Sequence, residues 1–173
     1  NVATIRRIRE GRAGPVPVDL DQVIREEIAH HPDARITYEG SRTLVLADDL
    51  LPEVFTNLIG NAAKHGGPGV EIVVTVEDAE EEGMVAVTIA DTGPGVPDSA
   101  KKRIFARFEQ GAARESGQGL GLSICRMLLD RYGGRIWAED RVAGHPEEGA
   151  AFRLTLRKAG GSEPLEPGAS RAP

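Results

Sequence analysis

Two neighbouring segments rich in Val and Ile constrain the fold of this chain most. They cover residues 70–76 and 84–90, and the acidic segment 77–83 between them ends in Gly83. β-Branched residues favour strands, and a charged segment that ends in Gly favours a solvated loop. We therefore expect two strands that follow one another along the chain.

Helical spacing of apolar residues appears in three other segments: 20–30, 49–65 and 120–132. Four shorter runs have β-prone composition: 35–38, 43–47, 135–139 and 151–156. The first two of these runs flank Glu39, Gly40 and Ser41, which predicts a hairpin or a pair of adjacent strands. The mixture of strand pairs and packed helices predicts an α/β fold, an α+β two-layer sandwich whose mixed sheet is covered on one face by helices.

The domain organisation follows from length and punctuation. A chain of 173 residues fits one domain, which we expect to cover residues 16–158. Val2, Ile5 and Ile8 recur at three-residue spacing, so residues 1–15 are predicted to be the end of an amphipathic helix followed by a Gly/Pro linker. Residues 159–173 have little to bury and predict a disordered tail.

Composition narrows the class of partner. The formal net charge is −6 and the longest cationic run is 101–103, which argues against nucleic acid as a partner. Cys125 is the only cysteine, so the chain has no internal disulfide, which suits the reducing cytoplasm. No apolar run approaches the roughly 18 residues that span a bilayer, so no membrane contact by this chain is expected, although a membrane anchor elsewhere in a parent protein is compatible with it.

Four polar residues follow one face of the predicted helix at 49–65. Glu53, Asn57, Asn61 and Lys64 are spaced so that their side chains stack on one side. An ordinary solvated face is one interpretation. Two Asn residues in mid-helix favour a functional one, because Asn is a poor helix former. An amide oxygen is also a suitable Mg²⁺ ligand, and Mg²⁺ takes the rest of its shell from water and phosphate.

Two glycine-rich segments indicate a nucleotide site. Residues 91–95 follow the second apolar strand, so Asp91 is placed to accept a hydrogen bond from an exocyclic amine while glycines admit a flat ring. Residues 117–122 open the helix at 120–132, where free N–H groups and the helix dipole favour phosphate. Neither G-x-G-x-x-G nor a P-loop is present. Between these segments, residues 97–116 are typical of a mobile lid.

The order of these motifs resembles that of the ATP-binding catalytic domain of sensor histidine kinases, in the superfamily that includes DNA gyrase B and MutL. The resemblance covers residues 16–157. Residues 53–64 resemble the N box, 91–95 the first glycine box, 104–108 the F box and 117–122 the second glycine box. It implies a Bergerat-type fold that binds ATP and Mg²⁺.

The resemblance also implies roles for individual residues. Asn61 is the implied magnesium ligand, Asn57 and Lys64 lie near the phosphates, and Asp91 binds the adenine amine. The implied catalytic residues are Asn57, Lys64 and Arg107. Relatives often carry a basic or aromatic lid residue just beyond position 108, where this chain has Glu109 and Gln110. Arg107 is therefore taken as the lid contact in its place. The remaining implied nucleotide-binding residues are Gly93, Gly95, Gly117, Gly119, Leu120 and Gly121.

No histidine of this chain has the context of a phosphate acceptor, which is a His followed by an acidic residue on a helix. His30 and His31 close a helix, His65 ends another, and His145 lies in a Gly/Pro segment. The resemblance therefore implies transfer of the γ-phosphoryl group to a histidine on dimerisation helices outside this chain, within a homodimer of the full-length protein. A response regulator is the implied downstream partner, and the isolated chain is not expected to phosphorylate itself.

Two alternative functions remain open. ATP hydrolysis in the superfamily uses a Glu one turn before the magnesium Asn, and here Asn57 occupies that position. A neutral amide is a poor general base, so hydrolysis would depend on Glu53 one turn further back. The second alternative is a non-catalytic module that binds ATP and signals by contact.

Overall fold

The computed structural model of the chain describes residues 2–11, 13–106 and 118–160. The helices are α1 (Val2–Glu10), α2 (Leu20–Ala29), α3 (Leu51–His65), the 3₁₀ helix η1 (Arg103–Phe105) and α4 (Gln118–Arg131). The strands are β1 (Val16–Asp19), β2 (Arg35–Tyr38), β3 (Leu44–Ala47), β4 (Glu71–Asp78), β5 (Met84–Asp91), β6 (Arg135–Val142) and β7 (His145–Arg157). Among the described residues, no helix is both long and apolar enough to cross a bilayer.

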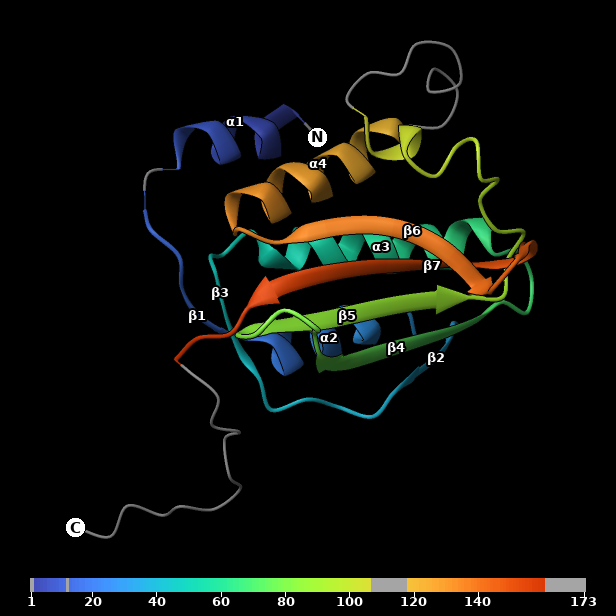
Figure 1. The fold of residues 1–173 in the computed structure, drawn as a ribbon, viewed down its shortest axis with the longest axis horizontal. Coiled ribbons are helices and arrows are strands. Elements are labelled where there is room, and N and C mark those ends of the chain that lie inside the picture. Colours follow the sequence, from blue (N-terminus) through green and yellow to red (C-terminus); the bar gives the residue numbers. More distant parts are fainter. Residues whose placement is uncertain (1, 12, 107–117, 161–173) are drawn as a thin grey trace, which may run out of the picture.

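The main sheet has five strands in the order β2-β4-β5-β7-β6. β2 and β4 run parallel, whereas the other neighbouring pairs are antiparallel, so the sheet is mixed. Helices α2, α3 and α4 pack in sequence on one face of this sheet (Figure 1). The predicted α/β fold with a mixed sheet and one helical layer is confirmed.

The predicted pairing of residues 35–38 with 43–47 is wrong. β2 pairs with β4 in the main sheet, whereas β3 pairs with β1 in a separate two-stranded sheet. The connection between β2 and β3 is held by α2 instead of forming a tight turn, because the Asp21 carboxylate accepts hydrogen bonds from the Tyr38 hydroxyl at 2.7 Å and from the Ser41 N–H at 3.0 Å. These bonds anchor the connection between the two strands to α2.

The core lies between α3 and the sheet. The apolar face of α3 is buried as its periodicity predicts, and its buried residues are Leu51, Val54, Phe55, Leu58, Ile59 and Ala62. β5 contributes Val85, Val87 and Ile89 to this core, and all three are almost fully buried. The polar residues on the other side of α3 are only half-buried or exposed.

The N-terminal helix packs against α4. Ile5 of α1 is buried, and the Arg131 guanidinium at the end of α4 donates to the Ile8 carbonyl at 2.9 Å. The same guanidinium forms an ion pair with Asp48 at 2.9 Å, just before α3. The predicted helix at the start of the chain is confirmed. At the other end, Ala159 donates its N–H to the Leu44 carbonyl, and most of the predicted tail, residues 161–173, lies outside the described residues.

Candidate nucleotide-binding site

The polar stripe of α3 has the geometry that its spacing predicts. Glu53, Asn57 and Asn61 are half-buried, and Lys64 is exposed in the last turn. The Asn57 side chain donates from Nδ2 to the Glu53 carbonyl at 2.8 Å, one turn earlier. This bond fixes the amide, so its oxygen faces away from the helix backbone.

The second glycine motif meets α3 at Asn57. A Cβ atom built on Gly121 would lie 2.5 Å from Asn57 Oδ1, much closer than a real Cβ contact. Only glycine at position 121 therefore allows the first turns of α4 to approach the amide oxygen this closely. The contact brings together two motifs that are 64 residues apart in the sequence, at 57 and 121.

Asp91 is the last residue of β5 and is only 7% exposed. Its Oδ1 accepts the Gly93 N–H at 2.9 Å, so the carboxylate is held by its own turn. Burial raises the pKa of Asp91, and this effect is opposed by hydrogen bonds from the Gly93 and Ala150 backbones and by the positive charge of Arg141. The result is a buried carboxyl at the end of a central strand with its orientation fixed.

A cavity of about 200 Å³ connects these elements. Asn61 and His65 line it from α3, Asp91 from β5, and Leu122 from α4. Its other lining residues are Ala62, Gly66, Pro94, Gly95, Val96, Ile104, Ala150 and Phe152. A few polar groups thus line an otherwise largely apolar cavity, which is the composition of a site for a flat heteroaromatic ring with a polar edge.

The predicted residues divide into three groups. Asn61, Asp91 and Gly95 line the cavity. Asn57, Gly93 and Gly121 lie against lining elements, since a Cβ on Gly93 would approach Gly66 Cα at 2.7 Å. The remaining residues form the third group: Lys64 and Leu120 belong to α3 and α4 but do not line the cavity, Gly119 belongs to α4, and Arg107 and Gly117 lie outside the described residues.

Sequence reasoning missed part of the cavity wall. Ala150 and Phe152 of β7 line it opposite α3, and Phe152 packs edge-on against Phe105 of η1 with ring centroids 6.0 Å apart. Alternating apolar residues in a strand indicate a core face but do not reveal that this face ends in a cavity. Ile104 of the predicted lid also lines the cavity, in agreement with its interpretation as an apolar anchor.

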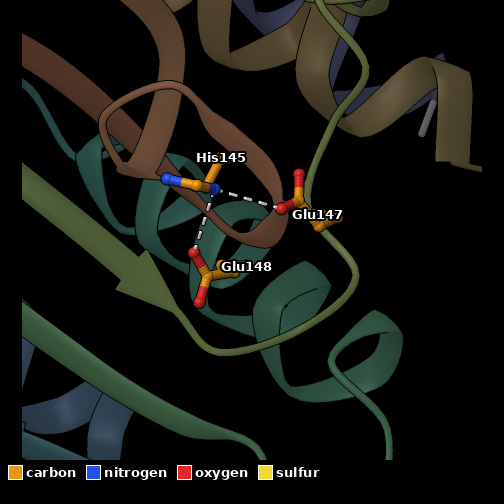
Figure 2. A group of neighbouring side chains, drawn as sticks. All are labelled: His145, Glu147 and Glu148. Carbon is orange, nitrogen blue, oxygen red and sulfur yellow. Dashed lines mark hydrogen bonds and ion pairs between the residues drawn. The ribbon is translucent and has the colours of Figure 1, made fainter.

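Two other features of the structure are not part of this site. A larger cavity, of about 590 Å³, lies near the end of α2 and is lined by His30, His31 and Arg35, with none of the predicted site residues. His145, Glu147 and Glu148 form a group with metal-ligand spacing at the start of β7 (Figure 2). All three side chains are exposed, and such exposed groups commonly occur without a metal.

The site geometry agrees with the result of comparison with known proteins. The family model described as histidine kinase-, DNA gyrase B-, and HSP90-like ATPase matches residues 47–160, which is 114 of the 173 residues. The chain therefore belongs to this ATPase family. Within the family, it corresponds to the catalytic ATP-binding domain of histidine kinases.

Individual relatives support this assignment. The signal transduction histidine-protein kinase AfsQ2 of Streptomyces coelicolor is 34% identical over 166 residues, covering 90% of this chain and 29% of AfsQ2. Full-length ShkA in complex with AMPPNP superposes with a TM-score of 0.74 at 29% identity, covering 95% of this chain and 36% of ShkA. Histidine kinase ThkA in complex with the response regulator TrrA gives 0.69 at 28% identity, covering 91% and 46%. The chain thus spans under half of each of these proteins.

Proposed function

We propose that this chain binds Mg-ATP and transfers the γ-phosphoryl group to a histidine on a helical domain outside residues 1–173. The observation that carries the proposal is the convergence of Asn61 and Asp91 on one cavity, with Gly121 of α4 packed against Asn57. In this proposal, residues 16–158 form the catalytic domain, and residues 1–15 join it to dimerisation helices of the same protein.

The donor set of the cavity fits the nucleotide and the metal. Asp91 provides a fixed acceptor in the cavity wall, for which an adenine amine supplies the matching donor. Asn61 would hold Mg²⁺ through its amide oxygen, a neutral hard ligand that leaves most of the coordination shell to water and phosphate. Bound Mg²⁺ would offset the negative charge of the phosphates. Lys64, one turn beyond Asn61, adds a positive charge on the same face of α3.

In phosphoryl transfer the protein contributes mainly by positioning the reactants and by stabilising the charge on the phosphates. The acceptor imidazole nitrogen attacks the γ-phosphorus, the bond to the bridging oxygen of ADP breaks, and ADP leaves with the electron pair. We propose that Asn57 and Lys64 act near the phosphates, with Arg107 of the lid as a further contact. Gly117, Gly119, Leu120 and Gly121 would present backbone N–H groups there.

The structure favours transfer over hydrolysis. Asn57 stands where a hydrolase needs a general base, and its Nδ2 is already committed to the Glu53 carbonyl. The Glu53 side chain is not among the residues that line the cavity. Neither Asn57 nor Glu53 is therefore placed as the general base that the hydrolases of this superfamily use.

Calorimetric titration combined with a phosphate-release assay tests this function on the chain as it exists. We expect saturable ATP binding in the presence of Mg²⁺ and inorganic phosphate release no faster than in a protein-free control. Fast release of phosphate would show that the chain hydrolyses ATP and would contradict the proposed transfer. Absence of ATP binding would contradict the whole proposal. The finer partners, a homodimer of the parent protein and a downstream response regulator, rest on the kinase relatives and remain proposals, as does a cytoplasmic location.

A further inference from the structure

The β6–β7 hairpin contains a large bulge beside Asp91. Asp140 pairs with Ala150 and Val142 pairs with His145, so Arg141 alone lies opposite residues 146–149. Bulges of this kind redirect the chain locally and often occur next to functional sites. The extra residues of β7 lie against the loop that follows β5.

Backbone meets backbone at two points between the bulge and this loop. A Cβ atom on Gly149 would lie 2.0 Å from the Asp91 carbonyl oxygen, and one on Gly95 would lie 1.7 Å from the Pro146 carbonyl oxygen. Both glycines also have positive φ, +112° and +74°, which other residues rarely adopt. The two segments are therefore interlocked at a separation that no side chain would permit.

Polar contacts hold the bulge in the same place. The Ala150 backbone donates to the Asp91 carboxylate, and Arg141 Nε donates to the Glu148 carbonyl at 2.8 Å. The ion pairs of His145 with Glu147 and Glu148 in Figure 2 are 3.3 and 3.5 Å long between exposed side chains, so they add little. Gly149 and Arg141 are thus the residues that determine how the bulge sits against Asp91.

We propose that the bulge at residues 146–149, held by Gly149 and Arg141, positions the Asp91 carboxylate and thereby sets how strongly the site prefers adenine over guanine. The inference rests on the proposed function, in which Asp91 reads the adenine amine. Gly149 and Arg141 are positioning residues, because they act through Asp91 and do not themselves line the cavity.

The hairpin supplies its own matched control. Gly144 also has positive φ, +79°, but a Cβ atom there meets nothing within 4 Å. Gly144→Ala therefore also places a side chain at positive φ in the same hairpin, but without touching the loop after β5. Arg141→Ala gives a second variant that leaves the backbone glycines in place, since the Arg141 side chain is on the surface.

The experiment measures the affinities for Mg-ATP and Mg-GTP by competition for each variant, with circular dichroism to confirm folding. Gly149→Ala should lower ATP affinity about fivefold and GTP affinity less than about twofold, so the preference narrows, whereas Gly144→Ala should leave the ratio unchanged. Arg141→Ala should lower the ratio of ATP affinity to GTP affinity by about twofold.

An unchanged ratio in folded Gly149→Ala, or in Arg141→Ala if the glycine variant does not fold, would overturn the positioning role while leaving ATP binding intact. A ratio near one in the unmodified chain is a different result. It would refute adenine reading by Asp91, and the positioning role with it.

Discussion

Replacing Asn61 with Ala is expected to weaken Mg-ATP binding about tenfold or more, a loss of about 1.4 kcal/mol, with little change in thermal stability. Asn61 lines the cavity from the polar face of α3, whereas the apolar contacts of that helix come from its other face. Ala is also the better helix former, so the unliganded helix does not lose intrinsic stability. A loss of ATP affinity would then result from a change in the binding site and not from unfolding.

Calorimetry with and without a chelator tests whether the lost affinity of Asn61→Ala for ATP comes from a lost metal ligand. Chelation should lower the ATP affinity of the unmodified chain much more than that of Asn61→Ala, because the variant has already lost the metal ligand. Gln22→Ala is the matched control, since it removes an amide from an exposed position of α2 that bonds only Glu26 through its side chain. Equal metal dependence in Asn61→Ala and the unmodified chain would remove Asn61 from the magnesium site.

The unmodified chain is expected to bind ATP about tenfold or more tightly than GTP. Adenine offers an amine to the fixed Asp91 carboxylate, whereas guanine presents a carbonyl oxygen at the corresponding position. Two acceptors would then face each other in a buried site, and an unsatisfied buried group costs about 1–3 kcal/mol. Competition binding measures the ratio directly.

This preference should depend on pH in a defined direction. Burial raises the pKa of Asp91, so the carboxyl takes up its proton at a higher pH than an ordinary aspartate. Above this raised pKa the ionised group only accepts hydrogen bonds, and the preference is complete. As the pH falls through the raised pKa, a protonated Asp91 gains a donor for the guanine oxygen, so the ratio of ATP to GTP affinity should fall.

Asp91→Asn should imitate part of the acidic state at neutral pH. An amide can turn to donate to guanine as well as accept from adenine, so ATP affinity should fall and the gap should narrow. Asp78→Asn is the control, because Asp78 ends β4 and lies opposite Val85, at the far end of the ladder from Asp91. A GTP affinity equal to that of ATP in the unmodified chain would mean that residues 91–95 form only a turn.

The parts of the site that local sequence predicts are those fixed by the period of one element. Asn61 lies on the polar face of α3 because its spacing from Glu53 and Asn57 follows the helix, and Asp91 ends a strand whose Val- and Ile-rich composition is visible in the sequence. Gly121 is predicted to lie in the first turns of a helix, with its backbone near the phosphates. Its contact with Asn57 is a tertiary packing event that helical period alone does not specify.

The parts that could not be predicted depend on pairing between distant segments. The parallel pairing of β2 with β4 joins segments more than 30 residues apart, and no local turn signal reports it. The bulge opposite Arg141 depends on the register of the β6–β7 pair. The sequence around Gly149 predicts a loop but does not predict that Gly149 contacts the backbone of Asp91. Arg107 and Gly117 remain predictions.

The most direct measurement is phosphoryl transfer between separate proteins. The chain is incubated with γ-labelled Mg-ATP, alone and with the dimerisation hairpin of its parent protein. Label should appear on a histidine of the hairpin as an acid-labile phosphate, slowly because the pieces are not tethered, and not on the chain itself. Stable label on His30, His31, His65 or His145, or free phosphate formed in place of labelled hairpin, would contradict a catalytic domain that acts on a histidine outside its own sequence.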